Sequence, residues 1–141
     1  MIVVVDTSVL IKWFKQEKDT DKALEIRRAY LDEEIEIAIP DLVFYELSNV
    51  LRYDQEITKT SVSEAVNSIR DMDFQVMAPF TEYTDRMIEN SMEKDITVYD
   101  SAFLTLSEML NCRTVTADSE LAQKGSDRVK LLSDFEIKDQ I

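Results

Sequence analysis

Four acidic residues in this sequence lie at positions where a carboxylate needs a hydrogen-bond donor or a positive charge beside it: Asp6, Glu46, Asp100 and Asp118. Asp6 directly follows the apolar run Ile2–Val5, which predicts a buried strand, and helical spacing begins just after it. Two carboxylates at about 5 Å repel by roughly 3 kcal/mol at an effective dielectric of 20, so a cluster needs cations or protons. An oxygen-only cluster suits Mg²⁺ or Mn²⁺, which can activate water and neutralise a phosphate.

Glu46 is the most informative of the four because it interrupts an apolar helix face. At 100° per residue, the helix after Pro40 has an apolar arc made of Leu42, Tyr53, Val50, Val43 and Leu47. Glu46 falls in the middle of this arc, and a carboxylate there is costly unless it is paired or bound to a metal. A buried Glu that is paired with Arg or Lys, or that stays protonated, remains the alternative.

The three aspartates also have ordinary structural explanations. Asp6 and Asp118 each follow an apolar strand and precede a helix, where Asp is a common N-cap. If their strands are neighbours, the two carboxylates converge. Asp100 lies three residues after Thr97 in a variant capping box, at the rim of an arc made of Tyr99, Phe103, Leu106 and Leu110.

The elements that must position these acids alternate along the chain. The expected strands are Ile2–Val5, Ile35–Ile39, Phe74–Met77, Arg113–Ala117 and Arg128–Leu132. The expected helices begin after Asp6 and then cover Asp19–Glu34, Pro40–Tyr53, Thr58–Met72, Thr81–Lys94, Thr97–Leu110 and Ser119–Lys124. Pro40 is expected in the first turn of its helix. Five short strands that alternate with helices predict an α/β fold with a mostly parallel sheet.

Composition narrows the function classes. The 141 residues predict a single domain, 1–141, of ordinary globular composition. The chain has no histidine, which excludes His-based catalysis and Cys/His zinc sites, and its one cysteine, Cys112, fits a reducing compartment. With no signal peptide or membrane span in the sequence, we expect a cytoplasmic protein. The net charge of −13 argues mildly against nucleic-acid binding, unless the acids surround a cation site.

Four stretches in this order resemble the PIN-domain ribonucleases, in particular the VapC-type toxins of type II toxin–antitoxin pairs. The resemblance covers essentially the whole chain and rests on VVVDTSVLI, IPDLVFYELSNVL, TVYDSAFLTLSE and TVTADSEL. It implies a three-layer α/β/α fold with a sheet in the order 3-2-1-4-5. It also implies hydrolysis of RNA with one or two Mg²⁺ or Mn²⁺ ions held by Asp6, Glu46, Asp100 and Asp118. Ser8, Asn49 and Thr116 match positions that support such a site.

The same resemblance implies partners. Members of the family are commonly homodimers, and the toxins among them are blocked by an antitoxin peptide near the active-site groove. The nearest basic cluster in sequence consists of Lys12, Lys15, Arg27 and Arg28, for which we expect a solvated face. No feature of the sequence indicates which RNA is cut.

Three other functions compete with a nuclease. Haloacid-dehalogenase-like phosphatases also place Asp after an N-terminal strand, but they need a second Asp where this chain has Ser8. One glycine cannot build a dinucleotide-binding loop. A non-catalytic scaffold that keeps the metal pocket remains open. For the nuclease, the expected reaction is in-line attack by activated water that leaves a 5′-phosphate and a 3′-hydroxyl.

Overall fold

A parallel sheet runs through the centre of the molecule. In the computed structural model, which describes residues 1–140, five strands lie in the order β3-β2-β1-β4-β5 and every neighbouring pair is parallel. The strands are β1 (Ile2–Val5), β2 (Glu36–Pro40), β3 (Gln75–Met77), β4 (Arg113–Thr116) and β5 (Val129–Leu131). The predicted α/β class and the implied strand order are both confirmed. Ile141, the last residue of the predicted single domain, lies outside the described residues.

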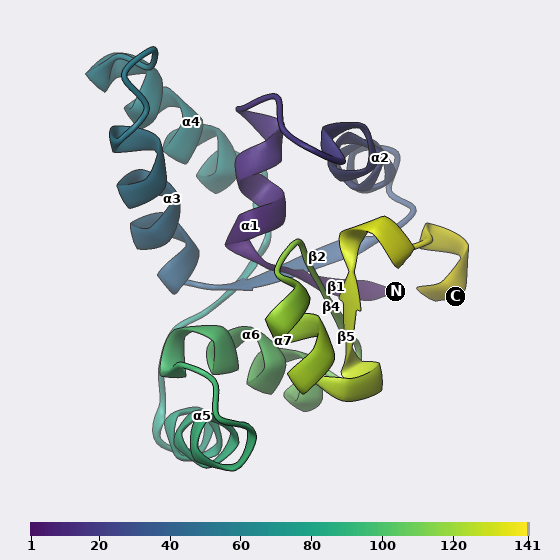
Figure 1. The fold of residues 1–141 in the computed structure, drawn as a ribbon. Coiled ribbons are helices and arrows are strands. Elements are labelled where there is room, and N and C mark those ends of the chain that lie inside the picture. Colours follow the sequence, from purple (N-terminus) through teal and green to yellow (C-terminus); the bar gives the residue numbers. More distant parts are fainter. Residues whose placement is uncertain (141) are drawn as a thin grey trace.

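Helices cover both faces of the sheet, so the fold has three layers. The helices are α1 (Thr7–Leu10), α2 (Thr20–Leu31), α3 (Leu42–Arg52), α4 (Lys59–Asp71), α5 (Thr81–Lys94), α6 (Val98–Met109) and α7 (Ser119–Lys124). Short 3-10 turns are η1 (Ile11–Trp13), η2 (Ser126–Arg128), η3 (Leu132–Asp134) and η4 (Ile137–Gln140). In Figure 1, α1 to α4 lie above the sheet and α5 to α7 lie below it.

The central strands fix where the candidate site forms. Val4 of β1 pairs with Ala38 of β2 on one side and with Thr114 of β4 on the other. The main-chain NH of Asp6 extends the second ladder, because it donates to the carbonyl of Val115 at 3.0 Å. The loops after β1 and β4 therefore leave the sheet side by side, as expected for ligand-binding loops of a parallel sheet.

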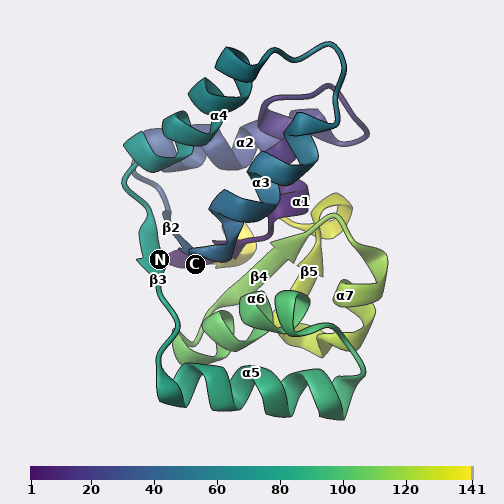
Figure 2. The ribbon, with the colours of Figure 1, turned by 90° about the vertical axis from the view of Figure 1, so that its left-hand side faces the viewer.

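The strand β1 consists of β-branched apolar residues because it is buried in the core. Val3, Val4 and Val5 have no exposed surface, because helices cover this strand on both sides. The turned view in Figure 2 shows α5 and α6 across one face of the sheet, while α3 and α4 extend away from the other face. No helix within residues 1–140 has both the length and the apolar character that crossing a membrane requires.

Two sequence expectations about local structure are wrong. Pro40 is the last residue of β2 rather than part of the first turn of the next helix. It pairs with Met77 of β3, and a proline tolerates the end of a strand because no further ladder donor is needed there. Tyr99, expected in the buried arc of its helix, is 62% exposed. The helix α6 is buried through Ser101–Ser107 instead, so polar residues share its core-facing surface.

Candidate active site

Asp6 lies at the centre of the candidate site and is held by two hydroxyl groups. Its carboxylate Oδ2 accepts hydrogen bonds from Ser8 Oγ at 2.6 Å and from Thr116 Oγ1 at 2.7 Å. The residue is only 6% exposed. Burial raises the pKa of the Asp6 carboxyl, the two hydroxyl donors oppose that rise, and the negative charge of Asp118 adds to it. Asp6 occupies an N-cap position but makes no side-chain cap bond, so capping does not explain it.

The hydroxyls that hold Asp6 also tie the two strand ends together. Ser8 Oγ accepts from the main-chain NH of Ala117 at 2.9 Å, and Thr116 Oγ1 accepts from the NH of Asp118 at 3.0 Å. The two oxygens themselves lie 3.3 Å apart. Ser8 and Thr116 thus connect Asp6 to the loop that carries Asp118.

Glu46 reaches the same place from α3, and its partner is Thr7. Thr7 Oγ1 donates to Glu46 Oε1 at 2.7 Å. Burial raises the pKa of Glu46 to about 7, and the negative charges of Asp6 and Asp100 contribute to the rise. Thr7 was not among the residues predicted from the sequence. The signal that could have found it is a hydroxyl residue at the first helical position after a strand-end aspartate.

The surroundings of Glu46 differ from the predicted apolar arc. The buried residues of α3 are Val43, Leu47 and Leu51, while Val50 is 37% exposed and Tyr53 is 68% exposed. The carboxylate therefore lies at the border of the buried face rather than at its centre. The 100° spacing could not reveal this shift, because Tyr and Val count as apolar wherever they lie. The alternative of pairing with Arg or Lys is not seen among the described residues, since the partner is a threonine hydroxyl.

Asp100 and Asp118 both have capping roles at their helices. Thr97 Oγ1 accepts from the NH of Asp100 at 3.0 Å, as the capping-box reading predicts. Asp118 Oδ1 accepts from the NH groups of Glu120 and Leu121 at 2.9 and 3.4 Å, so its predicted N-cap role is confirmed. Burial raises the pKa of the Asp100 carboxyl, and the negative charges of Asp6 and Asp118 raise it further.

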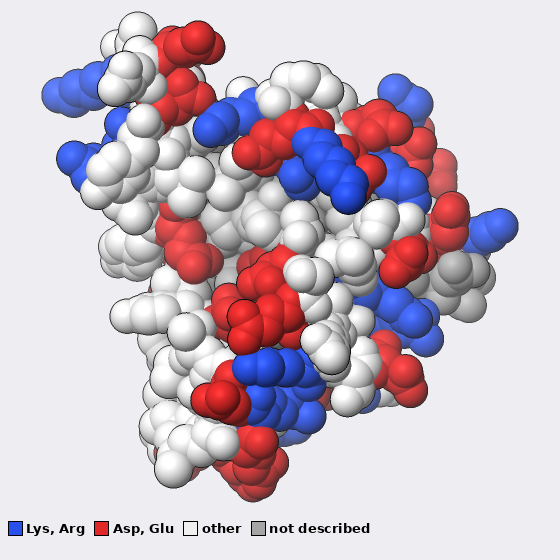
Figure 3. Space-filling model, viewed as in Figure 1, with Lys and Arg blue, Asp and Glu red and all other residues white. Residues whose placement is uncertain are grey.

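These interactions connect the four predicted acids into one electrostatic group. Asp6 is influenced by Asp118, Glu46 by Asp6 and Asp100, and Asp100 by both other aspartates. Figure 3 shows acidic side chains gathered near the middle of the face that it presents. Among the described residues, the ion pairs join other carboxylates to lysines, and none neutralises a member of this group.

The four carboxylates are ligands of the kind that divalent cations prefer, but their side chains are not arranged around a common point that an ion could occupy. All its donors are oxygens, and the burial of Asp6 together with mutual repulsion favours an added positive charge. Within residues 1–140, no three acidic or cysteine side chains are arranged so that they could hold an ion as they stand. Binding an ion would require these side chains to draw closer together.

Asn49 stays apart from this group. It lies on α3 one turn after Glu46 and is exposed. In the part of the chain that the structure describes, it makes no hydrogen bond to the four carboxylates, in contrast to Ser8 and Thr116. Among the described residues, no hydrogen bond of Asn49 supports the predicted role at this site.

The four basic residues near the N-terminus do not form one face. Arg27 and Arg28 are exposed, as the solvated-face interpretation predicts. Lys15 forms an ion pair with Asp54 at 3.3 Å. Lys12 differs from the prediction, since it is only 8% exposed.

Most of the chain matches one known domain family. The PIN domain family matches residues 3–126, which include all four carboxylates. The chain belongs to the PIN domain family. Membership replaces the phosphatase alternative, in which a second acid would stand at position 8; here Ser8 is a hydrogen-bond donor to Asp6. A comparison with curated proteins gives no significant match.

Solved PIN-like structures agree over nearly the full chain. PAE2754 from Pyrobaculum aerophilum superposes with a TM-score of 0.71 at 20% identity, covering 94% of this chain and 85% of that one. VapBC2 from Rickettsia felis, bound to a DNA fragment from its promoter, gives 0.69 at 14% identity, with 93% and 98% covered. VapBC-1 from nontypeable Haemophilus influenzae gives 0.68 at 17% identity, with 95% and 100% covered. At these identities the similarity establishes a shared PIN fold.

Proposed function

We propose that this PIN domain is a Mg²⁺- or Mn²⁺-dependent endoribonuclease that hydrolyses RNA phosphodiester bonds. The observation that carries the proposal is the mutual electrostatic influence of Asp6, Glu46, Asp100 and Asp118, none of which is neutralised by an ion pair among the described residues. Such a group tolerates its own charge only with protons or cations. One or two divalent ions would provide that charge.

The protein's own residues have separable tasks in this reaction. Ser8 and Thr116 fix the orientation of Asp6, and Thr7 fixes that of Glu46. The four carboxylates would hold the metal, which when bound supplies Lewis-acid stabilisation of the phosphate and lowers the pKa of water. Without metal, burial raises the pKa of Glu46 to about 7, so a bound cation would replace a proton at this carboxylate near neutral pH.

The products distinguish this mechanism from metal-free RNA cleavage. Water that attacks phosphorus in line leaves a 5′-phosphate and a 3′-hydroxyl. Cleavage through the 2′-hydroxyl leaves a 2′,3′-cyclic phosphate and needs an acid–base pair such as two histidines, which this chain lacks. End-group analysis of cleaved RNA therefore tests the mechanism, and a cyclic phosphate product would refute it.

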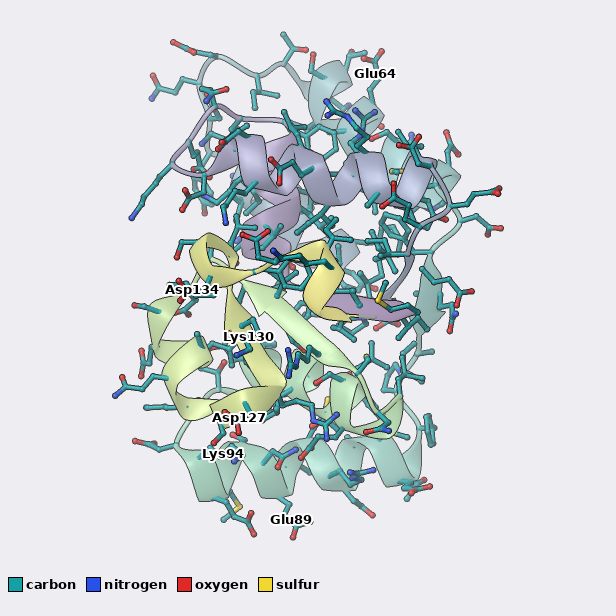
Figure 4. The ribbon with its side chains drawn as sticks, turned by 90° about the vertical axis from the view of Figure 1, so that its right-hand side faces the viewer. Glu64, Glu89, Lys94, Asp127, Lys130 and Asp134 are labelled. Atoms are coloured by element: carbon teal, nitrogen blue, oxygen red, sulfur yellow. The ribbon has the colours of Figure 1, made fainter. Side chains whose placement is uncertain are left out.

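Cleavage of a mixed RNA substrate with and without divalent metal tests the activity itself. We expect cleavage with Mn²⁺ or Mg²⁺, none in EDTA, and none in the Asp100→Asn variant. Asp127→Asn is the matched control, because this exposed aspartate lies in η2 (Figure 4), just before β5 begins, at the opposite edge of the sheet from the ends of β1 and β4. Cleavage that persists in EDTA and in Asp100→Asn would contradict the proposal and indicate a contaminant.

A non-catalytic scaffold is the second candidate, because the same carboxylate group would bind a divalent ion whether or not RNA is cut. A scaffold that keeps the pocket would gain thermal stability from Mn²⁺ without cleaving any RNA tested. The Asp100→Asn variant would then lose the thermal stabilisation by Mn²⁺, and neither it nor the native protein would cleave the RNA. This pair of measurements separates the two functions in one set of samples.

We also propose that the protein is the VapC-type toxin of a toxin–antitoxin pair and acts in the cytoplasm. The support is membership of the PIN family and the shared fold with chains from VapBC complexes. The test is co-expression with the product of an adjacent gene. An antitoxin should form a stable complex, restore growth and suppress RNA cleavage, whereas a stand-alone processing enzyme should show no such partner.

A groove between α3 and α4 suits such an antitoxin. It has a volume of about 550 Å³ and combines apolar and basic side chains, with Ile57, Val62 and Val66 beside Arg52, Lys59 and Arg70. An amphipathic segment with acidic residues along one edge would complement both properties. Reversing the charge in Arg70→Glu should weaken the complex without changing RNA cleavage by the free protein.

A second copy of the chain is the partner we propose for an apolar surface beside α5 and α6. A hollow of about 180 Å³ there is lined mostly by apolar residues, among them Leu42, Met77 and Val98. Val98 is 41% exposed. Phe80 follows Pro79, which also lines the hollow, and is 44% exposed. Exposed apolar side chains in one region mark association surfaces. Light scattering should give the mass of a dimer, and Val98→Asp should give a monomer.

A further inference from the structure

A small hollow beside the carboxylate group is lined by lysines in a chain that is otherwise strongly acidic. Its volume is about 230 Å³, and its lining consists of Lys12, Lys18, Asp19, Ala117, Ser119, Leu131, Leu132 and Ser133. Two of these residues flank Asp118 in the sequence: Ala117 lies on the loop that follows β4, and Ser119 is the first residue of α7. The hollow therefore borders the candidate active site directly.

Lys12 is the unusual member of the lining because it is a nearly buried cation. Its side chain is 10% exposed, and its ion-pair partner is Glu17, whose Oε1 lies 3.4 Å from Nζ. This distance is long for a charge-assisted hydrogen bond, which is typically about 2.7–2.9 Å. An ammonium group has three donors, so Lys12 retains capacity for an anion in the hollow.

The position of Lys12 on its helix places it next to the site. Lys12 follows Ser8 by four residues, so the two side chains lie on one face about one helical turn apart. Ser8 Oγ accepts from the main-chain NH of Ala117, and Ala117 also lines the hollow. A chain of contacts thus leads from Asp6 through Ser8 to the lysine-lined space.

The hollow brings two ammonium groups together with two nearby carboxylates. Lys18 is exposed and adds a second ammonium, while Asp19 is the one acid in the lining and Glu17 approaches Lys12 from the same loop. Lys22 Nζ donates to the carbonyl of Ser133 at 2.9 Å and lies 4.0 Å from Glu136 Oε1, so its charge is matched by a neighbouring carboxylate. Figure 3 shows basic side chains on this face beyond the central acidic patch, on the side of α1 and α2.

We propose that Lys12 and Lys18 bind a phosphate of the RNA strand next to the phosphodiester that is cleaved. This inference rests on the proposed ribonuclease function and adds a substrate-positioning subsite to it. A backbone phosphate fits because lysine recognises it as a point charge and because such contacts fix register without reading a base. The subsite also offers a protein with a net charge of −13 a way to hold RNA, because two lysine ammonium groups gather in a hollow beside the site.

The test compares charge-removing and charge-keeping variants in steady-state cleavage of a short RNA. Lys12→Gln and Lys18→Gln should each raise KM about 5- to 30-fold and change kcat less than twofold, whereas Lys18→Arg should keep the KM of the native protein. Lys130→Gln is the matched control, because Lys130 lies on the outer side of the edge strand β5 (Figure 4). An unchanged KM in both lysine variants would overturn the proposal.

Salt dependence separates a phosphate contact from a merely structural role. Each lost contact should reduce the slope of log(kcat/KM) against log[salt] by about 0.7, the value for single strands. Lys130→Gln should leave the slope unchanged. A variant with lower kcat, unchanged KM and unchanged slope would show that the lysine supports the fold or the carboxylates, and would refute an RNA subsite.

Binding in EDTA distinguishes failure of this inference from failure of the nuclease proposal. A fluorescent oligouridylate should bind the native protein and bind Lys12→Gln and Lys18→Gln at least fivefold more weakly, whether or not the protein cleaves RNA. Binding without cleavage in Mn²⁺ would reject the nuclease and keep the subsite. Equal binding by all variants would reject the subsite. Tight binding of inorganic phosphate that leaves RNA affinity unchanged would assign the hollow to a free anion, also against the proposal.

Discussion

The hydroxyl of Thr116 donates to the carboxylate of Asp6 at 2.7 Å, across 110 positions of the sequence. Thr116 is the last residue of β4, and Asp6 is the first residue after β1. This bond exists because the two strands are parallel neighbours, so that their ends meet. It links the fold to the site, since the residue that ends one strand orients the acid that follows the other.

Replacing Thr116 with Val should weaken both the fold and the site. The variant keeps the side-chain shape but leaves the buried Asp6 carboxylate with one hydroxyl donor instead of two. Loss of a donor to a buried charged group costs about 1–3 kcal/mol in free energy of unfolding. The pKa of Asp6 should rise further, because a hydrogen bond that favours the ionised form is gone. Urea denaturation in EDTA measures the first effect.

Thr116→Ser is the control for this change, because it keeps the hydroxyl and removes only a methyl group. The serine variant should bind Mn²⁺ with an affinity within a few-fold of the native value, while the valine variant should bind more weakly. Equal stability and equal Mn²⁺ affinity for Val and native protein would show that the hydroxyl does not support Asp6.

Glu46 predicts how stability without metal depends on pH. Its folded-state pKa, about 7, lies above its ordinary value of 4.5, so the folded chain holds this proton more tightly than the unfolded chain. The free energy of unfolding should therefore be highest below pH 4.5 for this group and fall as pH rises to about 7. After allowance for solvent screening, the loss is on the order of 1–2 kcal/mol.

The Glu46→Gln variant should remove most of that decline, because a neutral amide carries no charge into the site. Urea denaturation in EDTA at pH 5 and pH 8 measures the difference for both proteins. Glu89→Gln is the control, since Figure 4 shows Glu89 pointing outward from α5. A native protein that is more stable at pH 8 than at pH 5, with no change in Glu46→Gln, would contradict the raised pKa.

Mn²⁺ should stabilise the native protein in proportion to its binding. At a concentration of 100 times Kd, one bound ion adds about 2.7 kcal/mol, which for a chain of this size raises Tm by about 5–10 °C. Asp6→Asn should lose this response and yet be more stable than the native protein in EDTA, because it no longer buries a charged carboxylate. Thermal melts with and without Mn²⁺ test both statements together.

The sequence predicted the framework well because its signals are local. The β-branched run of β1, the alternation in β2 and the caps at Thr97 and Asp118 each depend on neighbouring residues. The side-by-side placement of Asp6 and Asp118 is different, because it depends on strand order. Residue spacing left that order open, and only the resemblance to PIN domains implied it.

What the sequence missed depends on contacts between distant segments. Thr7 matters because α3 brings Glu46 beside it, and Lys12 is nearly buried in a hollow whose lining includes Ala117, more than 100 positions away in the sequence. Tyr99 was predicted in the buried arc of its helix because it is aromatic, but it lies at the surface, as aromatic residues often do. Residue type alone does not tell which face of a helix meets the rest of the protein.

Gly125 gives a last prediction about how α7, and with it the Asp118 cap, is held in place. The φ of Gly125 is −79°, so its backbone suits any residue, and the constraint is space. A Cβ there would lie 2.2 Å from Val129 Cγ2 and 3.0 Å from the carbonyl of Leu121. Gly125→Ala should therefore lower the free energy of unfolding by about 1–3 kcal/mol through overpacking.

A second substitution separates overpacking from a backbone effect. Adding Val129→Ala to Gly125→Ala removes the closest clashing atom, so the double variant should be more stable than the sum of the two single losses predicts. Gln123→Ala, an exposed change on the same helix, should leave stability within about 0.5 kcal/mol of the native value. Strict additivity of the two losses would mean that Val129 Cγ2 is not the atom that excludes a side chain at position 125. The contacts that remain in the double variant, with the Cβ of residue 129 at 2.7 Å and the Leu121 carbonyl at 3.0 Å, would then decide it.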